Sequence, residues 1–348
     1  MQLLFRRIRS VDVYSSGVRV RKYLKGHLLA LTAFIILSGC KEHVAEPVGE
    51  TISKEEEIWK APDTSTIPDD ERGDLIRYGL ELVSNTAYYL GPKGKVARIT
   101  NGMNCQNCHL EAGTRPWGNN YGRATATFPN YRHRSGTIET LTKRVNDCIE
   151  RSLNGKPIDS NSKEMKAMLS YMTWLGNEVP KGASPPGTGI RELAYLERPA
   201  DPTNGALVYR GQCQRCHGKD GSGTLNADAI TYQYPPLWGD HSYTTAAGLH
   251  RLSRMAGFIK ENMPFDSAKL GRELSIGDAW DVAAFINSQP RPNRTFKEDW
   301  PDISSKPPDH PFGPFIDSLP PAQHKYGPFG PILKIKQDYK EKKLSVSK

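Results

Sequence analysis

The segments CQNCH, residues 105–109, and CQRCH, residues 213–217, decide what kind of fold this chain adopts. Each places two thiols three positions apart, directly before a histidine. This C-x-x-C-H pattern is the attachment signature of c-type haem: both thiols bond to the porphyrin and the imidazole becomes an axial iron ligand. Two copies in a chain with six cysteines predict two covalently bound haem c groups. The predicted cofactor-binding residues are Cys105, Cys108, His109, Cys213, Cys216 and His217.

Two other chemistries explain these cysteines less well. A zinc site with four cysteines would need the two pairs far closer together than the 108 residues that separate them. A redox-active dithiol does not require the histidine that follows each pair.

Helical patterns recur around both motifs. One precedes each motif, near residues 75–82 and 206–209, and another closes each half, at residues 164–176 and 275–292. The closing segments have apolar residues spaced i, i+3, i+4 and i+7, typical of a one-sided helix. This layout is similar to the class I cytochrome c fold. We therefore expect an all-α chain of two tandem class I cytochrome c-like domains, each with one covalent haem, followed by a Pro- and Gly-rich C-terminal tail.

Composition shifts along the chain predict the boundaries of these parts. Proline and glycine rule out regular helix in most of the tail, whereas its Phe and Tyr residues predict packing on the body. We expect only the last dozen residues, QDYKEKKLSVSK, to be disordered. The expected parts are a leader at 1–39, a flexible polar tether at 40–70, a first domain at 71–182, a linker at 183–200, a second domain at 201–300 and the tail at 301–348.

The N-terminal residues predict export and lipidation. A positive stretch precedes an apolar run from about residue 28 to 37, a length that suits a signal peptide and is too short to span a bilayer. The run ends in LSGC, residues 37–40, which resembles a bacterial lipobox with Cys40 as the lipidated residue. Ordinary cleavage that leaves Cys40 as a free thiol is the alternative. Residues 1–17 precede a normal-looking signal and are either an extension or a mis-set start.

The expected location follows from these signals. Covalent haem attachment also occurs outside the cytoplasm, and Lys41 after the cysteine resembles outer-membrane sorting in Gram-negative lipoproteins. We therefore expect an exported protein, anchored by lipid in the outer membrane and facing the periplasm.

The net charge excludes nucleic acid as a partner. The leader carries seven of the basic residues and one acidic residue, so that the chain from residue 40 on has 40 basic and 37 acidic residues, a net charge of +3. Nucleic-acid-binding proteins usually carry a strong basic stripe.

The second half contains a methionine suited to be the sixth iron ligand. Met263 precedes a proline, about 46 residues after His217 and 22 before Phe285 in the closing helix. This placement resembles the methionine loop of cytochrome c. Met255, His250 and Lys260 are the rival ligands.

Cys148 holds the equivalent position in the first half. It lies 39 residues after His109 and 23 before Tyr171 in the closing helix. Its expected helix begins at Thr137 as N-cap and carries Ile138, Leu141, Val145, Cys148 and Ile149 on one inward face. The methionines of this half lie on the closing helix, apart from Met103, which is too close to Cys105. Cys148 is therefore predicted to be the distal thiolate ligand, with a small buried hydrophobe as the alternative.

Basic residues surround this cysteine. Arg144, Cys148 and Ser152 are spaced i, i+4, i+8 and share one stripe of the helix. Lys143 and Arg151 are interpreted as a solvated face balanced by Asp147 and Glu150. Arginine beside a sulfur ligand instead indicates a small oxyanion with a sulfur atom to exchange.

At this point several segments together resemble the dihaem thiosulfate dehydrogenases, also described as bidirectional tetrathionate reductases. The resemblance covers most of residues 70–335. The segments that carry it are GMNCQNCHLEAGTRPWGNNYG, ATFPNYRHRSGTIETLTKRVNDCIERSLNG, EMKAMLSYMTWL, the Met263–Pro264 loop and KYGPFGPI.

The resemblance implies an oxidoreductase that couples two thiosulfate ions to tetrathionate, or catalyses the reverse reduction. It implies a catalytic haem held by His109 and Cys148 and an electron-relay haem held by His217 and Met263. Arg134, Arg144 and Ser152 fall where the family places its substrate-contacting residues. An electron-transfer protein or small cytochrome is the implied partner.

Two alternatives stay open at the level of sequence. One is a lipid-anchored cytochrome that only carries electrons, with Cys148 as a structural residue. The other is a related thiolate-haem enzyme that transfers thiosulfate to a carrier protein's cysteine.

Overall fold

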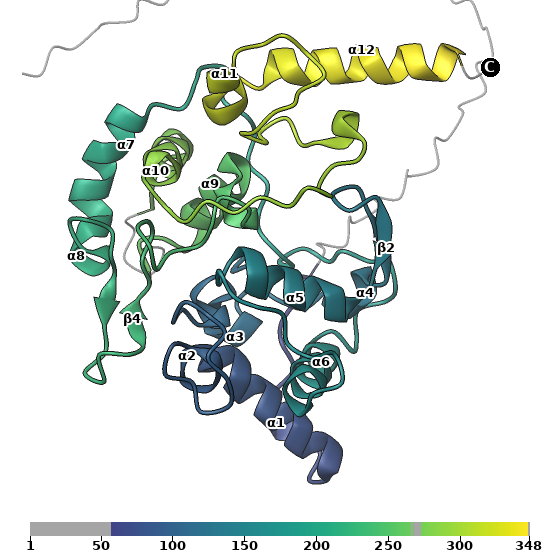
Figure 1. Cartoon of the computed structure of the whole chain (residues 1–348), viewed down its shortest axis with the longest axis vertical. Coiled ribbons are helices and arrows are strands. Elements are labelled where there is room, and N and C mark those ends of the chain that lie inside the picture. Colours follow the sequence, from purple (N-terminus) through teal and green to yellow (C-terminus); the bar gives the residue numbers. More distant parts are fainter. Residues whose placement is uncertain (1–56, 266, 268–272, 347–348) are drawn as a thin grey trace, which may run out of the picture. The chain divides into compact units, whose positions relative to one another are not determined.

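Helices dominate the structure, a computed structural model that describes residues 57–265, 267 and 273–346 (Figure 1). The predicted leader, the lipidation of Cys40 and the tether as far as residue 56 lie outside the described residues. None of the helices in the described part of the chain has the length and hydropathy needed to cross a bilayer.

The first half places its haem motif between two long helices. The first helix, α1, begins after Asp70, whose side chain accepts a hydrogen bond from the Gly73 amide, and it packs against α6 at the end of the half. The elements are α1 (Glu71–Ser84), α2 (Thr86–Leu90), η2 (Cys105–Asn107), α3 (Leu110–Gly113), α4 (Ala124–Thr127), β1 (Asn130–Arg132), β2 (Thr137–Glu139), α5 (Leu141–Arg151) and α6 (Lys163–Leu175).

The second half repeats this order with α7 and α10 as the packed pair. Its haem motif spans the end of a π-helical turn and α8. The elements are α7 (Pro202–Val208), η3 (Tyr209–Cys213), α8 (Gln214–His217), β3 (Thr224–Leu225), β4 (Tyr232–Tyr234), η4 (Gly248–His250), α9 (Leu252–Asn262) and α10 (Ile276–Ser288).

A glycine permits the close crossing of the first and last helices in each half. A Cβ atom on Gly79 of α1 would lie 2.1 Å from the carbonyl oxygen of Ala167 in α6. A Cβ atom on Gly205 of α7 would lie 1.9 Å from the carbonyl oxygen of Asp281 in α10. Only glycine allows backbones to approach so closely. The two halves therefore share one frame, built at equivalent positions.

The hairpin before α5 differs from the sequence prediction. Residues 137–139 form strand β2, paired antiparallel with β1, so the helix does not begin at Thr137. The N-cap is Thr140, whose side-chain oxygen accepts from the Lys143 amide at 3.2 Å. Ile138, expected on the inward face, is 72% exposed. Two neighbouring threonines could each cap the helix, and strand pairing selects the later one.

Part of the expected tether is packed rather than flexible. Trp59 is buried against Ala126 and Val179, and its amide donates to the Pro186 carbonyl oxygen at 2.8 Å. An indole removes enough apolar surface from water to hold an otherwise polar segment on the body.

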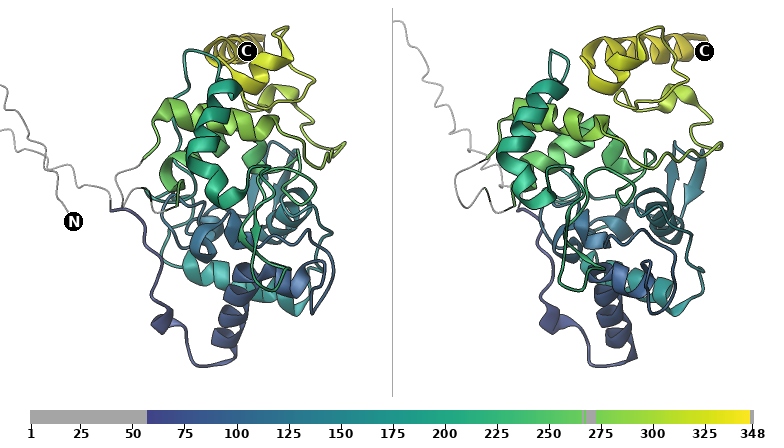
Figure 2. Two further views of the ribbon diagram at one scale, coloured as in Figure 1. Left: turned by 90° about the vertical axis from the view of Figure 1, so that its left-hand side faces the viewer. Right: turned by 60° about the vertical axis from the view of Figure 1, so that its left-hand side comes forward.

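The tail packs on the second half, and its end is helical. Phe329 and Ile332 are buried in the core, while α11 (Pro321–Tyr326) and α12 (Gly330–Val346) lie on the opposite side from α1 and α6 (Figure 2). The expectation that the last dozen residues are disordered is wrong as far as Val346. Four of these twelve residues are Lys, which favours helix, and the side chain of Gln337 donates to Glu341 one turn later.

Candidate active site

One cavity gathers the first haem motif and the predicted catalytic residues. This inner pocket has a volume of about 320 Å³ and is lined by Cys105, Cys108 and His109 on one side. Cys148 and Ser152, from α5 and its C-cap, line it as well. Residues separated by about forty positions thus meet as the spacing predicted.

The histidine of the first motif is held ready to bind iron. Its Nδ1 bonds the Asn119 carbonyl oxygen, and its ring stacks on Tyr121 with centroids 4.5 Å apart. Burial lowers the pKa of His109 to about 4, so that the imidazole stays neutral, the form that coordinates metal. With Nδ1 engaged, Nε2 is the nitrogen left to act as a ligand.

The inner pocket fits a covalent haem. Its two motif thiols are free of disulfides, and its walls are largely apolar. Among the described residues, no group of three or more His, Cys, Asp or Glu is arranged to hold a bare metal ion. The apolar lining consists of Ala124, Phe128, Leu141, Val145, Ile149, Leu153, Met168, Met172, Ile190, Ala247 and Leu249.

Cys148 stands beside an arginine within this pocket. Arg144 Nη1 donates to Cys148 Sγ at 3.1 Å, because the two residues are one helical turn apart. The charge of the Cys148 thiolate raises the pKa of Arg144. Iron ligation by Cys148 stays a prediction. Met168 and Met172 also line the pocket, although their place on the closing helix argued against them as ligands in the sequence. They are the rival sulfur ligands of the iron.

Positive charge is concentrated around this sulfur. Seven arginines and a single acidic residue, Asp147, line the inner pocket. Four of the arginines are paired with carboxylates, and the other three, Arg123, Arg134 and Arg144, have no carboxylate partner among the described residues. Arg123 instead donates to the Ser184 hydroxyl, which leaves Arg134 and Arg144, the two arginines that the family resemblance assigned to substrate contact. The seven are Arg123, Arg132, Arg134, Arg144, Arg151, Arg251 and Arg254.

Arg151 is not part of a solvated face, as the sequence suggested. Its side chain is only 6% exposed, and it makes two hydrogen bonds to Asp299, of 2.6 and 2.8 Å. Lys143 is exposed, as expected, and pairs with Asp147. The sequence could not locate Arg151 because its partner lies 148 residues further along, at the end of the second domain.

The second haem motif has a similar local arrangement. His217 Nδ1 bonds the Pro235 carbonyl oxygen at 2.9 Å, and burial lowers the pKa of this imidazole. Met263 is the C-cap of α9, partly buried against the core, before a cis peptide to Pro264. Ligation by Met263 stays a prediction.

The rivals of Met263 have other contacts. Lys260 pairs with Glu273 at 3.0 Å, and Met255 is buried in the core. His250 lies before α9 and lines a different cavity.

Sequence reasoning missed the contribution of the second half to the inner pocket. Tyr243, Arg251 and Arg254 line it, although they lie about a hundred residues from Cys148. Arg251 is held by buried Asp309 of the tail, with a shortest N–O distance of 2.6 Å. No local motif marks these residues. Only the packing of both halves and the tail brings them together.

Comparison with known proteins identifies both halves. Residues 95–180 match the family described as SoxA/TsdA, cytochrome c domain, and residues 200–286 match cytochrome C oxidase, cbb3-type, subunit III. The prediction of two tandem cytochrome c domains in an all-α chain is therefore confirmed.

Longer similarities cover most of the described chain. The thiosulfate dehydrogenase of Psychrobacter arcticus is 41% identical over 244 residues, which cover 70% of this chain and 72% of that protein. The thiosulfate dehydrogenase of Allochromatium vinosum is 38% identical over 266 residues, which cover 75% and 92%.

A solved structure agrees. The "as isolated" form of thiosulfate dehydrogenase (TsdBA) from Marichromatium purpuratum superposes with a TM-score of 0.62 at 30% identity. The match covers 67% of this chain and half of that longer chain.

Proposed function

The chain belongs to the thiosulfate dehydrogenase family and is an enzyme of that kind with two covalently bound haem c groups. From this premise we propose that it joins two thiosulfate ions to tetrathionate at Cys148. The observation that carries the proposal is the contact of 3.1 Å between Arg144 and Cys148 Sγ inside the inner pocket. A sulfur nucleophile, the haem attachment motif and unpaired arginines occur together there.

The difficulty of this reaction is electrostatic. Two dianions about 4 Å apart repel each other by about 4 kcal/mol in water, and by roughly four times as much at an effective dielectric of 20. Preorganised cations must offset this repulsion. Arg134 and Arg144 are suited to the task because no described carboxylate neutralises them.

We propose two steps at the cysteine sulfur. In the first, the Cys148 thiolate and one thiosulfate form an S–S bond, giving Cys–S–S–SO₃⁻ and releasing two electrons. In the second, the outer sulfur of another thiosulfate attacks the sulfane sulfur of this adduct. The S–S bond between Cys148 Sγ and the sulfane sulfur breaks, tetrathionate leaves, and the Cys148 thiolate is restored. Both steps conserve atoms and charge.

The chain's other residues bind and orient the anions. Arg144 donates toward the sulfur, Arg134 faces the incoming oxyanion, and Ser152 at the C-cap of α5 offers a hydroxyl. Haem bound through Cys105, Cys108 and His109 would accept one of the two electrons at a time, and haem bound through Cys213, Cys216 and His217 would take up the other. His109 and Cys148 would hold the iron of the first haem, and His217 and Met263 would hold that of the second.

The reverse reaction uses the same residues, since each step can run backwards. The proposal therefore includes reduction of tetrathionate to thiosulfate. It also includes export, lipid anchoring through Cys40 in the outer membrane facing the periplasm, and electron transfer to a small redox protein.

The test compares the processed, haem-loaded protein with its Cys148→Gly variant. Tetrathionate formed from thiosulfate is measured with an artificial electron acceptor, and covalent haem is counted by its absorbance. We expect turnover to disappear in the variant while both haems remain attached. Turnover that survives in Cys148→Gly would contradict the mechanism.

The matched control is Met168→Leu, which removes the rival sulfur from the same pocket at similar volume. It should retain turnover. If Met168→Leu lost turnover and Cys148→Gly retained it, Met168 and not Cys148 would be the sulfur ligand.

A further inference from the structure

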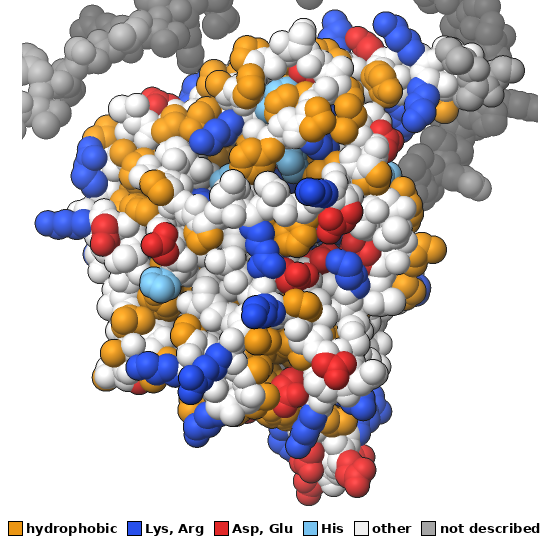
Figure 3. Space-filling view, viewed as in Figure 1, with side chains coloured by type: hydrophobic (Ala, Val, Ile, Leu, Met, Phe, Trp, Pro, Cys, Tyr) orange, Lys and Arg blue, Asp and Glu red, His pale blue; other side chains and the backbone are white. Residues whose placement is uncertain are grey.

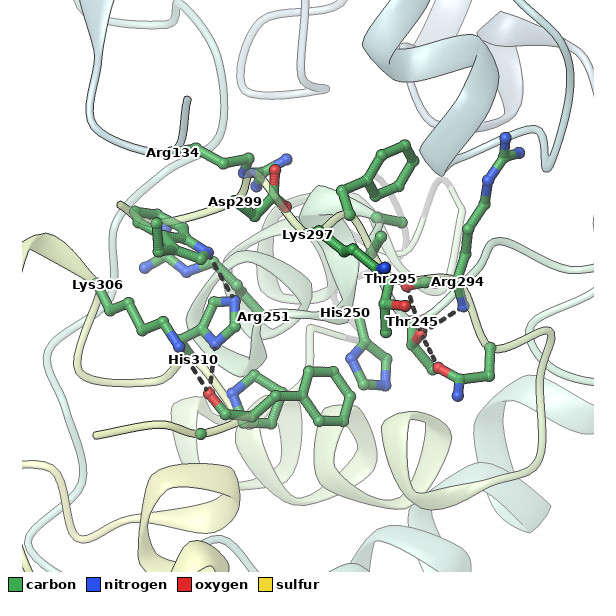
Figure 4. A pocket seen from close by; sticks show the side chains of 18 of the residues that line it. Arg134, Thr245, His250, Arg251, Arg294, Thr295, Lys297, Asp299, Lys306 and His310 are labelled. Carbon is green, nitrogen blue, oxygen red and sulfur yellow. Dashed lines mark hydrogen bonds between the residues drawn. The ribbon is translucent and has the colours of Figure 1, made fainter. Parts of the chain in front are cut away.

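A second cavity, here called the outer pocket, adjoins the inner pocket. Its volume is about 530 Å³, and most of its lining comes from residues 293–314 (Figure 4). The opposite wall comes from residues 245–251, with Arg134 at the boundary. Arg134, Ala247 and Arg251 line both cavities. The two spaces therefore meet across shared side chains.

The outer pocket carries an excess of positive charge. Five basic side chains line it, against one carboxylate, Asp299, which is already occupied by Arg151. Figure 3 shows basic and acidic side chains close together between the tail and α5. The five are Arg134, Arg251, Arg294, Lys297 and Lys306.

Two of the five basic side chains are neutralised by neighbours. Arg251 pairs with Asp309 at 2.6 Å, and Arg294 approaches Glu150 at 3.6 Å. Arg134, Lys297 and Lys306 pair with no carboxylate in the described part of the chain.

Lys306 is the least expected of these cations, since its residue is only 7% exposed. Its ammonium group donates to two carbonyl oxygens, those of Phe312 at 3.2 Å and Pro314 at 3.0 Å. Burial lowers the pKa of Lys306. Burying an unpaired charge is costly, and a bound anion would offset that cost.

Two polar atoms at the outer pocket lack partners. Arg134 Nε and His250 Nδ1 are buried and make no hydrogen bond. Burial and the nearby Arg151 and Arg144 lower the pKa of Arg134 to about 10, so an anion would favour its charged form. His250 is 7% exposed and stacks on Phe312, with ring planes 3° apart. A buried polar atom without a partner calls for an explanation, and a bound ion is one that would satisfy Arg134 Nε.

We infer that the outer pocket is a second binding site for a small dianionic sulfur oxyanion, thiosulfate in the oxidative direction, which reaches the inner pocket past Arg134. The inference rests on the proposed function, because that function consumes two dianions in succession. The second dianion must approach while the first still occupies the inner pocket. A separate cationic site nearby raises its local concentration without forcing the two into contact.

Lys297 is the residue best placed to test this site. Its ammonium group lies among the labelled side chains of Figure 4, and the residue is exposed, so its removal should not disturb the fold. Lys166 on α6 is the matched control, an exposed lysine that lines neither pocket.

In steady-state assays of the holoprotein, Lys297→Ala should raise the KM for thiosulfate about twofold to fivefold, the range for one exposed charge. Lys297→Arg should restore the KM, and Lys166→Ala should leave it unchanged. The Lys297→Ala effect should shrink as ionic strength rises. Equal KM values for Lys297→Ala and Lys166→Ala would overturn the inference.

A binding measurement separates this inference from the proposed function. Crystals of the haem-loaded Cys148→Gly protein, soaked with thiosulfate, should show anomalous sulfur scattering in the outer pocket beside Arg134 or Lys297. Sulfur in the inner pocket alone, with normal turnover by the unmutated protein, would reject the second site and leave the proposed function intact. Sulfur in the outer pocket without any turnover would reject the function and keep the site.

Discussion

The two halves of the chain share a frame but differ in the helix that precedes the closing helix. In the first half this helix is α5, whose buried residues include Asp147 and Arg151 beside Val145 and Ile149. In the second half it is α9, whose buried residues include no charged side chain. The glycine crossings set the common frame, and this one helix sets the difference. A fold that merely holds a haem becomes a site for chemistry through a few residues on one helix.

Making the first half resemble the second should have the largest effect. Cys148→Met places the predicted ligand of the second half in the first. We expect turnover to fall by at least about a thousandfold, because the nucleophile is lost. The potential of that haem should rise, because methionine ligation favours the reduced state relative to thiolate. Redox titration and the tetrathionate assay measure both effects.

The reciprocal control is Met263→Leu. It should shift the potential of the second haem and leave tetrathionate formation detectable with an acceptor. Loss of turnover in Met263→Leu equal to that in Cys148→Met would show that the halves do not divide the work as proposed.

Removing Arg144, the arginine beside Cys148 on α5, should have the next largest effect on turnover. Arg144→Ala deletes the donor 3.1 Å from Cys148 Sγ. A hydrogen bond to a charged group contributes about 1.5–3 kcal/mol, so kcat/KM should fall roughly tenfold to a hundredfold. Arg123→Ala, in the same pocket but bonded to Ser184, is the comparison variant. Unchanged kcat and KM in Arg144→Ala would remove this arginine from the site.

The shared frame can be tested by disturbing both crossings alike. Gly79→Ala and Gly205→Ala each force a methyl group to within about 2 Å of a carbonyl oxygen. Each should lower stability by about 3 kcal/mol, as overpacking does, and lower the Tm of the holoprotein. Gly330→Ala, where an added Cβ meets no atom within 4 Å, should have little effect. If only one of the two substitutions lowers the Tm, the two halves do not share the same helix crossing.

The smallest expected effect concerns the tail's contact with the second half. Burial alone would raise the pKa of Asp309, but Arg251 and Ser253 outweigh it and hold that pKa below its ordinary value. The ion pair therefore stabilises the fold above about pH 4, and this contribution is lost as pH falls through the lowered pKa.

Asp309→Asn should accordingly lower the Tm at neutral pH, and the gap to the unmutated protein should narrow in acid. Asp338→Asn, on the exposed end of α12, is the control. A gap that is constant from neutral to acid pH would contradict the role of this ion pair.

The predictable part of the molecule was local. C-x-x-C-H motifs and helix periodicity were enough to predict the closing helices α6 and α10 and the two cytochrome c domains. The spacing of Cys148 from His109 also placed both in one cavity. These inferences worked because each depends on fixed covalent spacing or on the 3.6-residue period of one helix.

What escaped prediction depends on distant contacts. The sequence predicts Arg151 on the surface because its partner, Asp299, is remote in sequence. Arg251 belongs to the second domain, whereas the pocket that it lines surrounds the haem motif of the first. The start of α5 was misplaced because strand pairing, and not capping, chose between Thr137 and Thr140. Tertiary packing overrides local preference in each case.

The bond between Arg151 and Asp299 also sets an order of assembly. The first domain is synthesised before residue 299, so until then Arg151 lacks its two hydrogen bonds to Asp299 and has only Asp147, 3.9 Å away on the same helix, as an acidic neighbour. The last part of the chain to be synthesised completes the wall of the outer pocket, whereas the inner pocket is lined by residues no later than Arg254. A fragment that ends near residue 292 keeps both attachment motifs and both glycine crossings. We expect such a fragment to carry as much covalent haem as the whole protein, with the lining of its inner pocket present and its outer pocket left open on one side.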